Sequence, residues 1–323
     1  MPNHVLLIGA GFSHNWNAPL ASEVANSLLQ EVGRDPYLQP LLRKHGKNFE
    51  NALSEVQREF IASPNSEEAR ARLNTVQGAI GTMFTRLNQV FERNTDLNFS
   101  NEVQYSVRGF LTRFDALFSL NQDLLLELQY QDHVLLCSNT RWNGLQMPGM
   151  VPIHDPSITG IGDKHRRQWK PTTPPFTVQP RLQPCFKLHG SSNWRTDDGR
   201  NLLVIGGNKD FMIREHAVLT WYYDQFRSYL ARPDTRLMVI GYSFSDQHIN
   251  DVIVEAWRNG TLQGMFLVDP AGRAVLNPTR GLPLPLPNDL EDVPSLGGST
   301  RTLDRIFGGD AFAHQEFMRF FVP

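Results

Sequence analysis

Polar side chains that could do chemistry recur directly after short apolar runs of this sequence. Asn121 and Asp123 supply an amide and a carboxylate, and His189 supplies an imidazole, which titrates near neutral pH. A histidine at such a place can act in acid–base chemistry or be purely structural, and its position alone leaves both readings open. The remaining members of the set follow three other apolar runs: Gly11, Ser13, Gly241, Ser243 and Asp269.

The apolar runs before these residues are predicted to be strands. Short runs of bulky apolar residues are typical of strands that are buried on both faces, as in a parallel sheet. Helical patterns separate the runs, so we expect an α/β fold with a parallel sheet flanked by helices. Such sheets bind ligands outside the carboxyl ends of their strands, and five polar clusters at five such ends predict one active site. The expected strands are Val5–Ile8, Asp115–Leu120, Val134–Cys137, Cys185–Leu188, Arg236–Ile240 and Gly264–Val268.

The first apolar run leads into the glycine turn Gly9–Ser13. Gly9 and Gly11 carry no Cβ, so the backbone can turn tightly there and approach a ligand closely. The segment Ala18–Val32 is predicted to form a helix whose N-terminal amides would face a diphosphate across the turn. The third glycine of the full dinucleotide fingerprint is missing. Nucleotide binding and an ordinary buried strand–turn–helix unit therefore both remain open.

The stretch from residue 35 to residue 105 has helical character and interrupts the pattern of strands. Apolar residues between Ala69 and Phe91 recur at steps of three and four, which predicts a long amphipathic helix with a stripe facing the core. Phe49, Leu53 and Phe60 indicate a shorter helix before it. We therefore expect residues 35–105 to form a helical insertion or lid beside a sheet domain made of residues 1–34 and 106–323.

The rest of the chain has weaker signals. Gly144–Pro184 is rich in proline and glycine and is predicted to be a long irregular loop. Its basic cluster, Lys164–Lys170, could meet phosphates or a partner, but a solvated loop is the favoured reading. The remaining helices are expected over Leu124–Tyr130, His216–Leu230, from near His248, and over Leu303–Phe321.

Composition excludes several classes of function. The 31 Lys and Arg nearly balance the 33 Asp and Glu, so broad binding to nucleic acid or to a membrane surface is not expected. Two cysteines, Cys137 and Cys185, cannot build a disulfide framework or a four-cysteine zinc site, and no metal is expected. No signal peptide is recognised, and no apolar run approaches the roughly 18 residues of a membrane span. We expect a soluble, cytoplasmic protein.

Four motifs taken together resemble the sirtuin superfamily, and more closely the bacterial sirtuin-like (SIR2-like) domains of anti-phage defence systems. The motifs are Gly9–Ser13, Phe118–Asp123, Lys187–Ser191 and Val239–Asp246. The resemblance covers the sheet framework, and it leaves the helical insertion and the C-terminus without support. It implies a Rossmann-like domain that holds NAD in extended form.

The resemblance also implies roles for the residues that match these motifs. Asn121 and His189 match the two central catalytic positions of the family, and Asp123 matches the residue that holds the nicotinamide carboxamide. The other matches bind the rest of NAD: Gly9, Ala10, Gly11 and Ser13 at the pyrophosphate, Gly241 and Ser243 near the adenosine, and Asp269 at a ribose hydroxyl.

This sequence departs from the sirtuin deacylases in two ways. It has no pair of Cys-x-x-Cys motifs for their zinc ribbon, and Ala18–Glu23 keeps a proline but lacks their Phe-Arg. Both losses argue against an acyl-lysine substrate and favour water as the nucleophile. The implied activity is that of an NAD glycohydrolase, which cleaves NAD to nicotinamide and ADP-ribose. An NAD or ADP-ribose sensor without turnover and an NAD-dependent deacylase remain as alternatives.

An unrestrained NAD hydrolase would deplete the NAD of its own cell. The resemblance therefore implies control, and in this family such activity serves abortive infection, an antiviral defence. We expect a homo-oligomer, or a complex with a separately encoded partner such as a HerA-type ATPase.

Overall fold

A seven-stranded parallel sheet forms the centre of the computed structural model, which describes residues 3–20, 23–24, 26, 28, 36–46, 49–63, 65–131, 141–158, 163–207, 209–277 and 288–322. The strand order is β11-β10-β9-β1-β2-β6-β3, and the neighbouring strands are all parallel. The predicted α/β architecture is thus confirmed. The strands are β1 (Asn3–Ile8), β2 (Ala116–Ser119), β3 (Leu145–Gln146), β6 (Gln183–Lys187), β9 (Thr235–Ile240), β10 (Leu262–Val268) and β11 (Ser295–Ser299).

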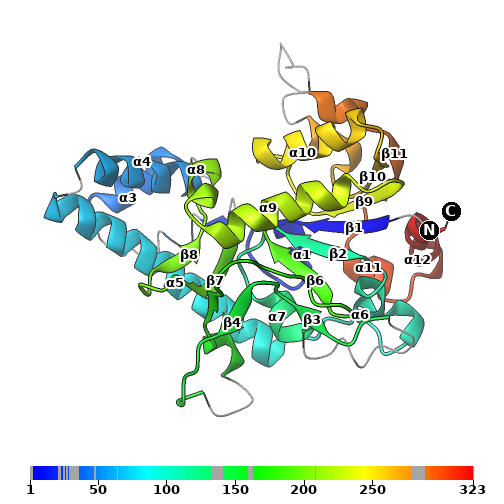
Figure 1. The fold of residues 1–323 in the computed structure, drawn as a ribbon, viewed down its shortest axis with the longest axis horizontal. Coiled ribbons are helices and arrows are strands. Elements are labelled where there is room, and N and C mark those ends of the chain that lie inside the picture. Colours follow the sequence, from blue (N-terminus) through cyan, green and yellow to red (C-terminus); the bar gives the residue numbers. More distant parts are fainter. Residues whose placement is uncertain are drawn as a thin grey trace.

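Helices cover both faces of this sheet (Figure 1). Alternate residues of a strand point to opposite faces, so Val5 and Leu7 of β1 join one core cluster and Leu6 and Ile8 join another. The first cluster lies under α9 (Ala217–Leu230) and α10 (Gln247–Arg258). The second lies under five short helices: α1 (Ala10–His14), α6 (Val107–Leu111), α7 (Leu125–Gln129), α11 (Leu303–Phe307) and α12 (Ala311–Met318).

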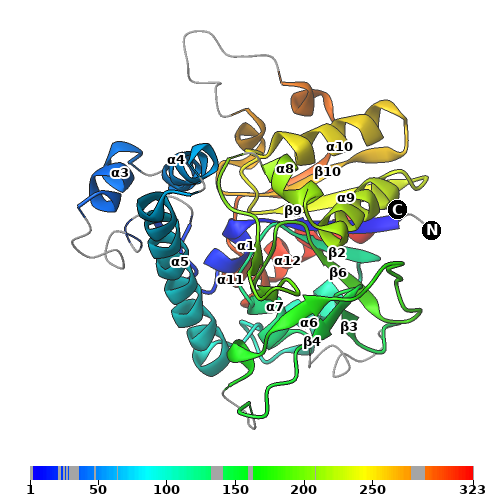
Figure 2. The ribbon, with the colours of Figure 1, turned by 60° about the vertical axis from the view of Figure 1, so that its left-hand side comes forward.

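Three helices between β1 and β2 form a group of their own at one side of the sheet (Figures 1 and 2). They are α3 (Leu38–Lys44), α4 (Phe49–Ala62) and α5 (Glu67–Asn94), and they share a third apolar cluster. Helix α5 begins at Glu67, where the hydroxyl of the preceding Ser66 caps it by accepting a hydrogen bond from the Ala69 amide. The two helices predicted from apolar spacing in this stretch are therefore present.

The register of the sheet aligns the strand ends that carry the polar residues. Ile8 of β1 pairs with Ser119 on one side and with Ile240 on the other, and the row continues to Lys187 and Val268. The loops after these five residues therefore leave the same edge of the sheet. The chain reverses its direction of strand addition between β1 and β9, and a ligand cleft is expected at such a switch point.

The loop predicted over Gly144–Pro184 is more ordered than its composition indicates. It contains two strands of a second, four-stranded sheet with the order β4-β5-β7-β8, where each strand is only three to six residues long. These strands are β4 (Met150–Pro152), β5 (Trp169–Pro171), β7 (Gly190–Arg195) and β8 (Asn201–Leu203). The second sheet packs Trp194 into the first core cluster, which explains why so short a set of strands is stable.

Other predicted elements differ from the structure at their ends. The first helix begins directly at the glycine turn as α1, whereas the expected helix Ala18–Val32 lies partly outside the described residues, and the expected strand Val134–Cys137 lies wholly outside them. The terminal helix is split into α11 and α12, because Gly308 and Gly309 interrupt it and Asp310 caps the second part. Within the described residues, the other short helices are α8 (Lys209–Arg214) and 3₁₀ turns of three to five residues. These turns are Val103–Tyr105, Lys164–Arg166, Gly272–Leu276, Asp289–Asp292 and Arg319–Phe321.

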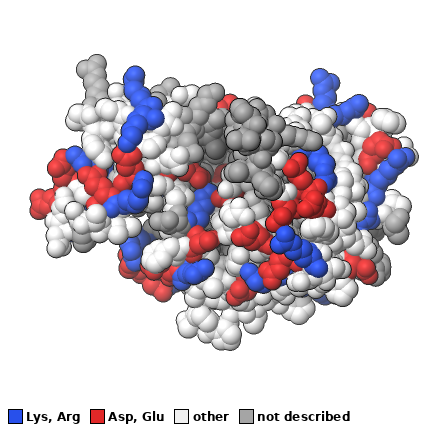
Figure 3. Space-filling model, turned by 90° about the horizontal axis from the view of Figure 1, so that it is seen from above, with Lys and Arg blue, Asp and Glu red and all other residues white. Residues whose placement is uncertain are grey.

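Acidic and basic side chains are interspersed on the surface seen in Figure 3. This distribution agrees with the near balance of charges in the sequence. Within the described residues, no helix combines the length and the apolar character that a membrane span requires.

Candidate functional site

A cavity of about 470 Å³ opens at the carboxyl ends of the central strands. Its walls come from the loops after β1, β2, β6, β9 and β10, as predicted for a single site. It brings together nearly all of the residues singled out from the sequence: Gly9, Ala10, Gly11, Asn121, Asp123, His189, Gly241, Ser243 and Asp269. Ser13 is the exception, because it lines a small neighbouring hollow beneath Asn121.

The glycines of this site hold two loops together. The amide of Gly11 donates to the carbonyl of Gly241 (2.9 Å), which joins the turn after β1 to the turn after β9. A Cβ on Gly11 would lie 2.6 Å from the Cα of Gly241, and a Cβ on Gly241 would lie 2.4 Å from the Cα of Gly11. Gly241 also has a φ of +61°, which favours glycine. The missing Cβ atoms are therefore explained by contact between loops, whereas the sequence suggested contact with a ligand. Ala10 is exposed and faces the cavity.

Asn121 is held in place from below. Its side-chain amide donates to the hydroxyl of Ser13 (2.9 Å), and its backbone amide donates to the hydroxyl of Ser119 (3.1 Å). Ser13 is buried on α1, so the glycine turn orients Asn121 through this bond. The structure thus places Ser13 behind a cavity residue and not on the cavity wall.

Asp123 combines a place at the cavity with a local structural role. One of its carboxylate oxygens accepts a hydrogen bond from the Leu125 amide (3.0 Å) at the beginning of α7. Its backbone carbonyl accepts a hydrogen bond from the buried ammonium of Lys187 (2.5 Å). These two bonds fix the direction in which the carboxylate meets the cavity.

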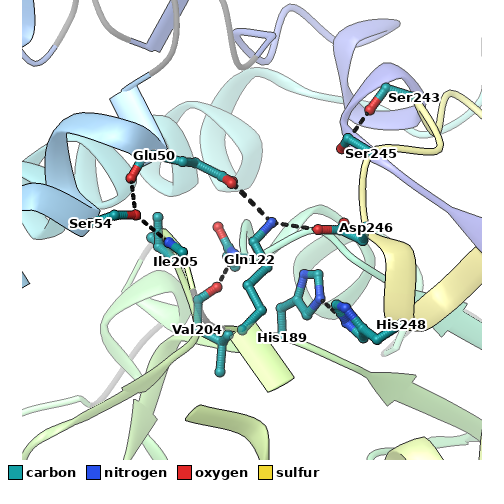
Figure 4. Close-up of polar contacts among 12 residues, drawn as sticks. Glu50, Ser54, Gln122, His189, Val204, Ile205, Ser243, Ser245, Asp246 and His248 are labelled. Carbon is teal, nitrogen blue, oxygen red and sulfur yellow. Dashed lines mark hydrogen bonds and ion pairs between the residues drawn. The ribbon is translucent and has the colours of Figure 1, made fainter. Parts of the chain in front are cut away.

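His189 follows β6 and is almost completely buried, yet it lines the cavity. Its Nε2 atom lies 3.2 Å from Nε2 of His248 (Figure 4). Burial lowers the pKa of His189 to about 3, although the carboxylate of Asp246 opposes the shift. His189 is therefore neutral at pH 7, and its pKa lies well below the neutral range assumed from the sequence.

A charged bridge crosses the cavity beside this histidine. The ammonium of Lys209 lies 2.8 Å from a carboxylate oxygen of Asp246 and 3.0 Å from one of Glu50. Figure 4 labels these two acidic partners. Burial alone would lower the pKa of Lys209, but the two carboxylates outweigh it and the pKa is raised. Glu50 belongs to α4 and Lys209 to α8, so the bridge ties the helical group to the loop after β9. Sequence reasoning missed Lys209 and Glu50, because neither follows a strand.

The far end of the cavity carries hydroxyls and charges. Ser243 lies 3.1 Å from the hydroxyl oxygen of Ser245, and Asp269 accepts from the Ala271 amide (2.8 Å). Burial raises the pKa of Asp269. Arg301 lines the same end and pairs with Asp310 at the start of α12.

Helices α4 and α5 supply an apolar wall to the cavity through Phe49, Met83, Phe84 and Leu87. Helix α5 also reaches the loops beneath the site. The buried Asn88 accepts a hydrogen bond from the Leu124 amide (2.9 Å) and donates to the hydroxyl of Ser192 (3.0 Å). One side chain thus connects the loop of Asn121 to the loop of His189.

We expect Asn88→Ala to lower the free energy of unfolding by about 1–3 kcal/mol, because it leaves the buried Leu124 amide without its partner. Urea unfolding followed by circular dichroism measures this change. Asn74→Ala is the matched control, since Asn74 is exposed on the same helix and its replacement changes only helix propensity. Equal stabilities of the two variants would contradict the role of Asn88.

Within the described residues, no group of three or more His, Cys, Asp or Glu side chains is placed to hold a metal ion. Of the two cysteines, Cys185 is buried in β6, where burial raises the pKa of its thiol to about 12, and Cys137 lies outside the described residues.

The SIR2-like domain family matches residues 115–280, which include the loops of Asn121, His189 and Gly241. The chain belongs to the SIR2-like family. The glycine turn of this SIR2-like protein lies before the matched range, and the register of β1 brings it to the same cavity. Among solved structures, the SIR2-like chain is similar to a Sir2 homologue mutant in complex with ADP-ribose, with 12% identity, a TM-score of 0.44, and coverage of 99% of this chain and 94% of the other. No curated protein matches the sequence.

Proposed function

We propose that this protein is an NAD glycohydrolase, which hydrolyses the bond between nicotinamide and ribose to give nicotinamide and ADP-ribose. One observation carries the proposal. A single cavity at the switch point of a SIR2-like sheet gathers the amide of Asn121, the carboxylate of Asp123 and the imidazole of His189 beside the paired turns of Gly11 and Gly241.

Each end of the cavity has groups that suit one part of NAD. The exposed Ala10 and the turn Gly9–Gly11 would lie against the pyrophosphate, with Ser13 acting from beneath through Asn121. Gly241, Ser243 and Asp269 would meet the adenosine, where Asp269 can accept a hydrogen bond from a ribose hydroxyl. Asp123 would hold the nicotinamide carboxamide.

The reaction breaks a glycosidic bond through an oxocarbenium-like state, in which positive charge spreads over the ribose. Groups that stabilise this charge where it develops lower the barrier most. The carboxylate of Asp123 faces the cavity and favours positive charge inside it, whereas the charge of Asp246 is paired with Lys209. Neutral His189 would accept a hydrogen bond from the attacking water or from a ribose hydroxyl, and Asn121 would orient that water.

The absence of zinc-ribbon cysteine pairs from the sequence favours water over an acylated peptide as the nucleophile. The wall formed by α4 and α5 supports a lid function for the helical insertion of residues 35–105, which the Lys209 bridge would hold closed.

We further propose that the activity depletes cytoplasmic NAD in abortive infection, and that a homo-oligomer or a partner such as a HerA-type ATPase controls it.

The test is release of nicotinamide and ADP-ribose from NAD by the purified protein without any peptide, measured by chromatography. Release of both products in equal amounts supports the proposal. Tight binding of NAD without products, both alone and with candidate partner ATPases, would favour a sensor. Release that requires an acylated peptide would favour a deacylase.

A further inference from the structure

His189 contacts His248, and His248 in turn lies close to Asp210. The family resemblance assigns no role to His248 or Asp210. Nε2 of His189 lies 3.2 Å from Nε2 of His248, and Nδ1 of His248 lies 3.4 Å from a carboxylate oxygen of Asp210. The His248 side chain is only 9% exposed, whereas that of Asp210 is 59% exposed. The line therefore runs from the cavity through a buried histidine to a carboxylate at the surface.

The three residues come from separate elements. His189 follows β6, His248 lies in the first turn of α10, and Asp210 lies in α8. The hydroxyl of Tyr223 on α9 donates to the backbone carbonyl of His248 (3.0 Å), which helps to fix α10 in this position. The contact between the two imidazoles thus depends on the packing of three helices against the end of β6.

The carboxylate determines the tautomers along this line. Asp210 favours a proton on Nδ1 of His248, because a carboxylate can only accept a hydrogen bond. Neutral His248 then has a lone pair on Nε2, so Nε2 of His189 must carry the proton that joins the two rings. Nδ1 of His189 is consequently left with a free lone pair. This assignment rests on the 3.2 Å hydrogen-bond contact between the two rings and on the negative charge of Asp210, which lies at ion-pair distance from Nδ1 of His248.

We propose that His248, oriented by Asp210, is a positioning residue that holds His189 in the Nε2-protonated tautomer, so that Nδ1 of His189 is the proton acceptor in the cavity. This inference rests on the proposed NAD hydrolysis and assigns the atom that acts in it.

The proton balance of the step follows directly. An O–H bond of the attacking water breaks and its proton forms an N–H bond at Nδ1 of His189. The water oxygen forms a bond to the anomeric carbon of the ribose, while the glycosidic bond breaks and its electron pair leaves on the nicotinamide nitrogen. The Nε2 proton of His189 stays in its hydrogen bond to His248 and shares the positive charge with that ring. The proton at Nδ1 then leaves to solvent, which restores neutral His189.

His248 can support this step only while it is neutral. Burial lowers its pKa below the ordinary value of 6.5, and Lys209 lowers it further, although the carboxylates oppose both effects. A second proton on His248 would place two N–H groups face to face, so His189 would change to the tautomer that carries its proton on Nδ1 and would lose its acceptor in the cavity. Turnover should therefore fall with acid along a limb below pH 6.5 that belongs to His248. The charged or titratable groups around His248 are His189, Lys209, Asp210, Tyr223, Asp246 and Asp251.

The test compares two replacements of His248. Glutamine can still accept the hydrogen bond from His189 through its amide oxygen, whereas phenylalanine has a similar size and no acceptor. We expect His248→Phe to lower kcat for nicotinamide release by roughly 10–100-fold, the size of loss found when a group that orients a metal-bound imidazole is removed. His248→Gln should recover most of this loss, and its acid limb should move to lower pH. His154→Gln, at an exposed histidine outside the cavity, should change neither quantity.

A second readout needs no substrate. In protein with ¹⁵N-labelled histidine, NMR of the imidazole nitrogens should show His189 as the Nε2-protonated tautomer in the wild type, with its signals assigned by comparison with His189→Gln. A wild-type His189 with its proton on Nδ1 would overturn the inference, and so would full turnover in His248→Phe. A protein with the expected tautomer and no nicotinamide release would contradict the proposed function while supporting this assignment.

Discussion

Replacement of His189 by alanine is expected to lower the rate of nicotinamide release from NAD by about 10²–10⁴-fold, the usual contribution of a positioned acid–base group. His189 lines the cavity, and burial keeps its imidazole neutral at pH 7. The neutral ring can accept a hydrogen bond from water, which alanine cannot do. Initial rates at saturating NAD, measured for the wild type and the variant at pH 7.5–8 (about one unit above the ordinary histidine pKa), give this ratio.

Asn121→Ala should also lower the rate of nicotinamide release, although it does not remove a base. Asn121 is fixed by Ser13 and Ser119, so its removal takes away the group that orients the water and leaves the fold of the turn intact. His189→Gln keeps a polar side chain of related size and guards against an unfolded alanine variant. Wild-type rates in correctly folded His189→Gln or Asn121→Ala would contradict the assigned roles.

The choice of pH in these assays follows from the burial of His189. Its pKa is about 3 in the folded protein and 6.5 in an exposed histidine, so the unfolded chain binds a proton that the folded chain does not bind between these values. The stability that depends on neutral His189 is fully present above pH 6.5 and is lost as the pH falls toward 3. The comparison of His189 variants is therefore made above neutrality, and the acid limb of His248 is read only over the pH range in which circular dichroism shows the protein to be folded.

Most strands of the central sheet were predictable, because a strand that is buried on both faces consists of consecutive apolar residues. Val5–Ile8 and Leu237–Ile240 are continuous apolar runs, and each is followed by a glycine. The edge strand β11 contains no such apolar run. Its sequence contains Gly297 and Gly298, which disfavour strands, and it is held by pairing with β10. That pairing is a property of the folded sheet and not of the segment.

The sequence predicted those residues of the site that come directly after strands. The sheet register then places Asn121, His189 and Gly241 at one edge, as the sequence led us to expect. Lys209 and Glu50 lie on helices far apart in the chain and meet only because α4 and α8 converge over the cavity. A charged residue on a helix normally faces solvent, so no local pattern marks this pair. His248 was visible only as part of a helix start, because its neighbour His189 is remote in sequence.

Lys187 provides the second large effect that we expect. This lysine is only 2% exposed, and its ammonium lies 2.5 Å from a carboxylate oxygen of Glu127 and 2.8 Å from the hydroxyl of Ser191. It also donates to the carbonyl of Asp123, so it joins the loop of Asn121 to the loop of His189. Lys187→Met should lower the free energy of unfolding by about 3–5 kcal/mol, because it leaves the carboxylate of Glu127 buried and unpaired. Urea unfolding measures this loss.

The double variant Lys187→Met with Glu127→Leu distinguishes the contribution of Lys187 to stability from its role in positioning the loop of Asp123. Removing both charges avoids the unpaired carboxylate, so the double variant should be more stable than Lys187→Met alone. Both variants should release nicotinamide more slowly than the wild type. Neither retains the hydrogen bond to the Asp123 carbonyl, which holds the loop of Asn121 and Asp123 in place. Lys170→Met removes an exposed ion pair with Asp197 and should cost at most about 1 kcal/mol. Full turnover in the double variant would show that Lys187 serves stability alone, and a double variant as unstable as Lys187→Met would show that the unpaired charge is not the cause of the loss.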